Sequence, residues 1–352
     1  MTADLVALTL LLAVAAYTCA GGTDYGAGFW DLTAGGATRG KRPRWLIDHA
    51  MAPVWEVNNV WLIFIFVIMW TGFPVLFQTV FSAMWLPLAL AAVGMVLRGA
   101  GFAFRKAGRK LAGRRVYGAV FAVASLLTPF FLGAAVGGVA SGRVAAGTEA
   151  SADAWSNPTS LMFGLLAIAA TAFLGAVFLT SDAHRFDAPD LIGYFRWRAV
   201  AALVALAVLA VITLFVIADD SSYVRHGLTR GAGLVFVLVA LVAALATAWL
   251  LVRTPGRSAR IPAVGVVACG VIAWGMAQRP YLIPTSLTVD DAAGASGSLT
   301  WLMVVTLVAL VMVIPAVALL YWLDTRGELE ALTDSDLRRT TGPDADDTGG
   351  SA

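Results

Sequence analysis

The feature that most constrains this chain is a run of 41 residues, Val57–Leu97, without one charged side chain. As a continuous α-helix the run would be about 61 Å long, at 1.5 Å per residue. The hydrocarbon core of a bilayer is only about 30 Å thick, so the run predicts two membrane-spanning helices. Pro74 and Gln78 lie near its middle and mark the predicted turn between the two helices.

Seven further charge-poor segments have about the length of a span, which brings the predicted total to nine: Leu5–Ala20, Val116–Gly142, Leu161–Thr180, Ala199–Ala218, Gly231–Val252, Ile261–Gln278 and Ser298–Leu323. The first has no basic residues before it, so we interpret it as a span and not as a cleaved signal peptide. We expect an all-α polytopic membrane protein with one integral-membrane domain over residues 1–323. Residues 324–352 are expected to form a mostly disordered cytoplasmic tail.

Composition excludes several other classes of protein. Hydrophobic residues make up 59% of the chain and charged residues only 13%, whereas soluble proteins carry roughly 25% charge. A disordered chain, a disulfide scaffold and most soluble enzymes are therefore excluded. The net charge of +2 predicts no binding of nucleic acid.

The positions of Lys and Arg predict the orientation. Loops after the first, third, fifth, seventh and ninth segments hold 20 of the 24 Lys and Arg residues, and the other loops hold four. Cytoplasmic loops are enriched in Lys and Arg. The N-terminus is therefore expected outside and the C-terminus in the cytoplasm.

Glu56 is the first candidate for chemistry. The range Val57–Gly72 contains only 16 residues, so a span of about 20 residues must begin upstream, which places Glu56 about one turn inside the membrane. A carboxylate at that depth indicates a proton carrier. The alternative is an interfacial carboxylate favoured by the N-terminal helix dipole. Asn58 and Asn59 are expected to hydrogen-bond Glu56, to hold water, or to make ordinary contacts between helices.

Asp24 is the second candidate, in a glycine-rich segment that is expected to leave the first span in a tight turn. It either caps a loop or the next helix, or accepts protons at the cytoplasmic mouth. Arg98 closes the third span and is a candidate partner for Glu56 or Asp24, although cytoplasmic anchoring also explains it and Arg105.

The histidines and cysteines do not predict a haem or metal site. His49, His184 and His226 lie in predicted loops or at their edges, whereas buried haem needs axial ligands inside the spans. We therefore expect this chain to bind no haem and no metal by itself. Cys19 and Cys269 are expected to be small buried apolar residues.

The residues just described resemble those of subunit II of the cytochrome bd quinol oxidases. The resemblance covers most of the chain in order, and its most specific motifs are Gly22–Gly28 (GTDYGAG), Ala52–Ile63 (APVWEVNNVWLI), Trp70–Pro74 (WTGFP) and Leu97–Arg105 (LRGAGFAFR), with a weaker match at Tyr281–Thr288. Asn59 departs from the family, which commonly has His or Gln there.

The resemblance implies a non-haem subunit without independent catalysis. It implies a heterodimer with subunit I, which carries the b- and d-type haems, oxidises quinol and reduces O₂, in the bacterial plasma membrane. Glu56, in a motif that begins at Trp55, and Asp24 belong to the implied cytoplasmic proton path. A structural quinone and a small third subunit are compatible with the family. A secondary transporter and a purely structural membrane subunit are the alternatives, but no midplane charge accompanies Pro315, the one proline that interrupts a late span.

Overall fold

A computed structural model of the chain describes residues 1–36, 39–51, 55–107, 111–145, 147, 151–253 and 257–325. Within these ranges the side chains of residues 51, 55–57, 106, 107, 111–115, 257, 317 and 320–325 are outside the description. The chain forms two compact units, Met1–Leu299 and a second that begins at Thr300. The first unit holds every site discussed below.

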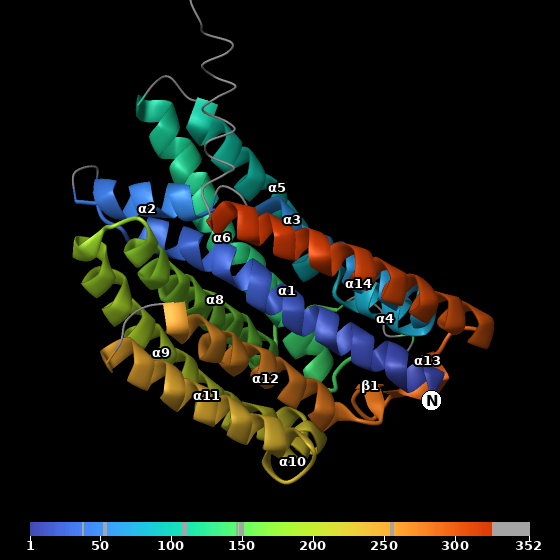
Figure 1. Ribbon diagram of the computed structural model, residues 1–352. Helices are drawn as coiled ribbons and strands as arrows, with labels where there is room; N and C mark the ends of the chain where they lie inside the picture. The colour runs from blue at the N-terminus through green and yellow to red at the C-terminus, as the bar shows by residue number, and fades with distance from the viewer. Residues whose placement is uncertain are drawn as a thin grey trace, which may run out of the picture. The chain divides into compact units, whose positions relative to one another are not determined.

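The described residues are almost entirely helical (Figure 1). The elements are α1 (Thr2–Leu32), α2 (Lys41–Met51), α3 (Trp55–Gly72), α4 (Pro74–Ala83), α5 (Trp85–Ala107), α6 (Leu111–Ala140), α7 (Ala152–Trp155), α8 (Pro158–Arg185), α9 (Pro189–Asp220), α10 (Ser222–Thr229), α11 (Gly233–Arg253), the 3₁₀ turn η1 (Arg257–Ala259), α12 (Arg260–Gln278), β1 (Tyr281–Ile283), β2 (Leu287–Thr288), α13 (Val289–Ala292) and α14 (Ser296–Thr325).

The predicted all-α membrane fold is confirmed. In the part of the chain that is described, 8 helices are long and apolar enough to cross a membrane, and the pair α3–α4, bent by 120°, makes a ninth span if counted as one broken span. The exception to all-helical structure is a short antiparallel hairpin that pairs Tyr281 with Thr288 and Ile283 with Leu287.

The turn predicted around Pro74 and Gln78 is wrong in detail. The chain bends at Phe73, and the 10-residue helix α4 then separates α3 from α5, which begins only at Trp85. Pro74 is the first residue of α4, where its missing N–H costs nothing, and proline disfavours helical backbone at the residue before it. The carbonyl of Gly72 accepts a hydrogen bond from the Gly294 N–H at 2.8 Å.

The expected exit of the first span at Gly21 and Gly22 is also wrong, because α1 continues as a helix to Leu32. A Cβ atom built on Gly26 would lie 1.9 Å from the carbonyl oxygen of Thr171 in α8, and one on Gly175 would lie 2.5 Å from the backbone of Gly26. The glycines therefore allow two helix backbones to touch, as small residues do between membrane helices. They do not form a turn.

α1 contacts α3, α6, α8 and α12, so it is the helix around which the first unit packs (Figure 1). The largest group of buried apolar side chains joins its second half to α8 and α9, through residues such as Trp30, Phe173 and Phe195. The indole N–H of Trp30 donates to the carbonyl of Ala172 at 2.8 Å, which fixes the same crossing a turn beyond Gly26.

We predict that Gly26→Ala lowers the free energy of unfolding of the purified protein by about 1–3 kcal/mol, the usual cost of overpacking. The added methyl group must displace the α8 backbone, which outweighs the higher helix propensity of alanine. Thermal unfolding in detergent measures the effect. Gly270→Ala in α12 is the control, because a Cβ there meets nothing within 4 Å. Equal stability of the two variants would contradict the close crossing.

Candidate functional site

Asp24 is a buried carboxylate inside α1, and a neutral amide holds it. The Nδ2 atom of Asn58 in α3 donates to Asp24 Oδ2 at 2.5 Å and to the carbonyl of Ala20 at 3.1 Å. Both Asp24 and Asn58 are buried. The amide thus joins α1 to α3, and it does so without supplying a counter-charge to the carboxylate.

Arg98 in α5 is the cation within electrostatic range of Asp24. Its Nε donates to Ser125 Oγ at 3.1 Å, and its guanidinium carbon lies 4.7 Å from the ring centroid of Tyr25 and 5.3 Å from that of Phe121. Its Nη2 is buried without a hydrogen-bond partner among the described atoms. Among the described side chains Arg98 and Asp24 form no direct ion pair, and the suggested pairing of Arg98 with Glu56 lies outside the described residues.

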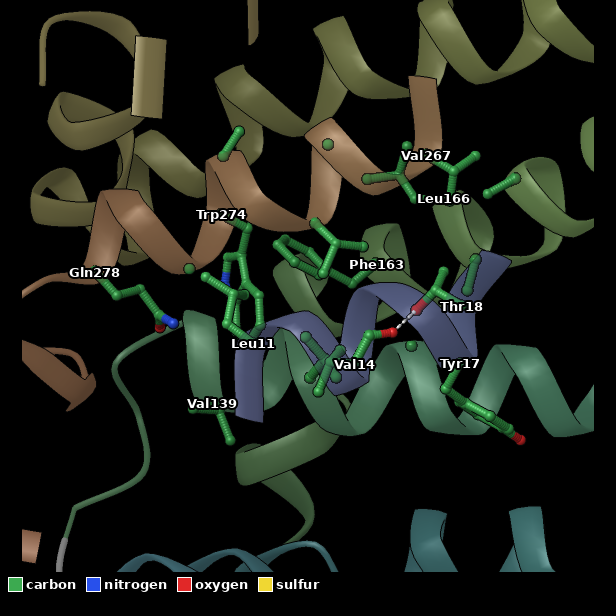
Figure 2. A pocket seen from close by; sticks show the side chains of 18 of the residues that line it. Leu11, Val14, Tyr17, Thr18, Val139, Phe163, Leu166, Val267, Trp274 and Gln278 are labelled. Carbon is green, nitrogen blue, oxygen red and sulfur yellow. Dashed lines mark hydrogen bonds between the residues drawn. The ribbon is translucent and has the colours of Figure 1, made fainter. Parts of the chain in front are cut away.

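Two tyrosines extend this group toward the apolar interior. The hydroxyl oxygens of Tyr17 and Tyr25 lie 3.3 Å apart, and both side chains are buried. In Figure 2 the Tyr17 hydroxyl points away from the other labelled side chains of the neighbouring cavity. We call Tyr17, Asp24, Tyr25, Asn58, Arg98 and Ser125 the Asp24 cluster.

A second buried carboxylate, Asp31, lies two turns further along α1 and has the opposite kind of environment. Arg44 Nε donates to Asp31 Oδ1 at 2.8 Å, and Arg105 bridges the other Asp31 oxygen to Asp48. The Asp31 side chain is 3% exposed. These four residues, the Asp31 network, fix the ends of α1 and α5 against α2.

The remaining predicted site residues lie outside the Asp24 cluster or have side chains that the structure does not describe. Trp55 and Glu56 begin α3, but their side chains lie outside the described residues. Asn59 follows Asn58 in α3 and is half-buried. Arg105, a residue with an expected structural or charge-pairing role, pairs within the Asp31 network.

Sequence reasoning missed the roles of Asp31, Asp48, Arg44 and Tyr17. The signal for Asp31 was its spacing of seven residues from Asp24, which places both on one face of a helix. The spacing is informative only if the helix continues from Asp24 to Asp31, and a turn at Gly21 and Gly22 was expected to end it earlier.

A large apolar cavity borders the Asp24 cluster. Its volume is about 1100 Å³, and its walls come from α1, α3, α4, α6, α8, α9, α11 and α12. Tyr17 and Tyr25 belong to its lining. At the far end α12 contributes Trp274 and Gln278, one turn apart (Figure 2). Trp274 Nε1 and Gln278 Oε1 are buried without a hydrogen-bond partner among the described atoms.

No group of three or more His, Cys, Asp or Glu side chains that could hold a metal ion occurs among the described residues. His49 and His184 each make a hydrogen bond to the backbone carbonyl four residues earlier, at 2.7 and 3.1 Å. Cys19 and Cys269 are free cysteines, the first of them buried.

The family model described as cytochrome bd terminal oxidase subunit II matches residues 2–324. Cytochrome bd-I ubiquinol oxidase subunit 2 of Escherichia coli strain K12 is 24% identical over 368 aligned positions, which cover 91% of this chain and 92% of the relative. The solved bd oxidase of Geobacillus thermodenitrificans includes a chain with the same fold, at a TM-score of 0.76 and 23% identity, covering 92% of this chain and 98% of that one. With the family model matching nearly its whole length, this chain belongs to the cytochrome bd terminal oxidase subunit II family.

Proposed function

We propose that this chain packs against a haem-bearing subunit I in a bacterial plasma membrane and supplies part of the path that carries cytoplasmic protons to the oxygen-reducing site. The family consists of subunits of quinol oxidases, and the resemblance assigns the b- and d-type haems to subunit I. The observation that carries the proton-path proposal is the environment of Asp24, which differs from that of Asp31 on the same helix.

A proton carrier inside a membrane must be able to change its charge at each turnover. Asp31 is held by two guanidinium groups, so protonating it would break ion pairs that compensate its burial. Asp24 receives its direct hydrogen bond from the neutral Asn58 amide. It can bind or release a proton while the surrounding ion pairs stay intact.

Asn58 holds one of the two carboxylates of the proposed path, Asp24. It lies two residues after Glu56 in α3 and contacts Asp24 in α1. Arg98 and the hydroxyls of Ser125, Tyr25 and Tyr17 surround the contact with polar atoms that can hold water. We propose that Glu56 and Asp24 relay protons, with Asn58 holding Asp24 in place.

Replacing each carboxylate by its amide tests the proton path. Asp24→Asn and Glu56→Gln keep the shape and most hydrogen bonds of each side chain but cannot titrate. Complexes with either variant should assemble with normal haem content and reduce O₂ about 10²-fold more slowly, the lower end of what a positioned acid–base group contributes. Glu56→Asp should retain more activity than Glu56→Gln, and Asp190→Asn, which changes an exposed carboxylate, should be normal.

Quinol-driven oxygen consumption measures the rate of O₂ reduction, and the haem absorption spectrum of the same sample measures the haem content. A wild-type rate in Asp24→Asn would show that Asp24 carries no protons. Failure of either variant to assemble with haem-loaded subunit I would make that residue structural, which also contradicts the proposal.

The proposed path needs the Asp31 end of α1 to face the cytoplasm, as the distribution of Lys and Arg predicts. Arg39, Lys41, Arg42 and Arg44 follow α1 at that end. A cysteine introduced at Ala107, the last residue of α5, in a chain that lacks Cys19 and Cys269 should resist a membrane-impermeant thiol reagent in intact cells. It should react after the cells are opened. Rapid labelling in intact cells would show that the orientation is the opposite of the predicted one.

We also propose that the apolar cavity holds a structural quinone. The chemistry of the lining supports this occupant: the cavity is large and apolar, and the Trp274 N–H is a buried donor without a partner among the described atoms, suited to a quinone carbonyl. The amide of Gln278 offers a donor or an acceptor, depending on which way it is turned. A bound quinone would satisfy these groups and fill the space between helices.

Removing the polar groups tests this proposal. Trp274→Phe and Gln278→Leu should each lower the amount of quinone extracted from the purified complex by about ten-fold, since each lost hydrogen bond contributes on the order of 1 kcal/mol and its partner is left unsatisfied. Gln78→Leu, at an exposed glutamine of α4, is the matched control. An unchanged quinone content in both cavity variants would contradict the assignment.

A further inference from the structure

Arg198 in α9 is a cation at the edge of the membrane that forms no ion pair with any described carboxylate. It directly precedes Ala199–Ala218, the charge-poor segment predicted to cross the membrane, and a helix of that length spans about 30 Å. Arg198 therefore lies near the boundary between lipid headgroups and acyl chains, on the side that the Lys and Arg distribution predicts to be cytoplasmic. A charge at that depth is costly unless a partner or water compensates it.

Aromatic and backbone contacts hold the guanidinium group of Arg198. Its Nη1 donates to the carbonyl of Tyr194 at 3.1 Å. Its central carbon lies 3.4 Å from the ring centroid of Tyr194 and 5.7 Å from that of Trp30 in α1. Trp30 is itself held by its hydrogen bond to the carbonyl of Ala172 in α8. The position of the guanidinium group is therefore set by two neighbouring helices.

The remaining donors of Arg198 suit a phosphate group. Nε and Nη2 donate no hydrogen bond among the described atoms, and the side chain is only half-buried. These two nitrogens form one edge of the guanidinium plane, with two parallel N–H groups. Such an edge binds two oxygens of a phosphate or carboxylate at once. Arg198 therefore presents a fixed pair of donors for an anion.

Nearby arginines show how the chain itself compensates such charges. Arg260 at the start of α12 pairs with Asp182 in α8 at 2.5 Å, and Arg42 in α2 pairs with Asp190 in the first turn of α9 at 2.8 Å. Arg198 has no such carboxylate among the described residues. Its counter-charge is therefore expected to come from another molecule.

The surface of α9 beside Arg198 suits an acyl chain. Ala201 and Ala205 follow Arg198 by three and seven residues, so all three lie on one face of the helix, and both alanines are exposed. Leu209 and Ile212 continue this face toward the other side of the membrane, Leu209 half-buried and Ile212 exposed. An apolar surface that begins with small side chains thus runs from the guanidinium group toward the membrane interior.

Trp197 favours lipid over protein as the neighbour of this part of α9. Its side chain is 61% exposed, and the guanidinium carbon of Arg196 lies 5.4 Å from its ring centroid. Tryptophan is enriched where membrane proteins meet lipid headgroups, because its ring is apolar and its N–H is polar. An exposed tryptophan next to Arg198 is consistent with a surface that faces headgroups.

We propose that Arg198 binds the phosphate of an anionic phospholipid, of which phosphatidylglycerol is the probe, with one acyl chain along Ala201 and Ala205. Nε and Nη2 donate to two phosphate oxygens, and the net negative charge of the lipid compensates the guanidinium group. Basic residues at the cytoplasmic membrane surface attract anionic lipids in this way. Because Tyr194 and Trp30 hold the guanidinium group, the lipid is bound at the junction of α9 and α1.

Photo-crosslinking tests the site. The two-subunit complex is placed in phosphatidylcholine nanodiscs that contain phosphatidylglycerol with a diazirine on one acyl chain, and peptide mass spectrometry measures the labelling of α9. The wild type should be labelled at or beside Ala201 and Ala205. Arg198→Gln should lower this labelling about five- to ten-fold, because it removes the charge and its hydrogen bonds together. Arg198→Lys should retain part of it, since the charge remains without the parallel donors.

The matched control is Arg196→Gln, which removes the same charge two residues earlier, on another face of α9, and should leave the labelling unchanged. Phosphatidylcholine with the same diazirine has a phosphate but no net negative charge. It should label α9 weakly, and equally in the wild type and in Arg198→Gln. Inorganic phosphate at millimolar concentration should not compete with the labelling by phosphatidylglycerol.

Three results would overturn the lipid site. Equal labelling of the wild type by the two lipids, or an equal loss in Arg196→Gln and Arg198→Gln, would show that no specific headgroup site exists. Competition by inorganic phosphate would assign Arg198 to a soluble anion. An absence of labelling by both lipids would show that protein covers this face. The comparison of the two lipids uses the wild type, so it remains decisive if Arg198→Gln fails to assemble.

Discussion

The structure depends on the burial of two carboxylates on one face of α1. A carboxylate inside a membrane costs several kcal/mol unless it is paired, hydrated or protonated. Asp31 is compensated by Arg44 and Arg105, and this fixes where α2 and α5 end against α1. Asp24, two turns away, has an amide as its direct partner and a guanidinium within electrostatic range. Two identical side chains on one helix therefore have different partners, two guanidinium groups for Asp31 and a neutral amide for Asp24.

The glycines of α1 make this arrangement possible. Because Gly26 and Gly175 let α1 and α8 touch, α1 passes through the middle of the first unit. Gly28 leaves room for Ser125, whose hydroxyl accepts the hydrogen bond from Arg98. The carboxylates are consequently enclosed by protein, where partners can be supplied, and do not face lipid. The same central position makes α1 a wall of the apolar cavity.

Much of the fold could be predicted from the sequence, because charge-free runs of about 20 residues have few alternatives to a membrane span. The helical end of the first span could not, since Gly21 to Gly28 has the composition of a turn and only the presence of α8 makes it a helix. The bend into α4 likewise depends on Phe73 and on the distant Gly294. Asp24 and Asn58 were found from their types and positions, and their contact required the geometry. The Asp31 network and the cavity join residues from separate helices, and within the network only Asp31 is marked locally, by its spacing of seven residues from Asp24.

The central claim is that Asp24 binds and releases a proton during turnover while Asp31 keeps its ion pairs with Arg44 and Arg105. Infrared difference spectra of the assembled complex, recorded between turnover and rest, test it most directly through the carbonyl band of protonated carboxyl groups. Because Glu56 is also proposed to carry protons, we expect a turnover-dependent component that is lost in Asp24→Asn and remains in the wild type, in Glu56→Gln and in Asp31→Asn. A spectrum unchanged by Asp24→Asn, or a component that is lost only in Asp31→Asn, would contradict the assignment of the two carboxylates.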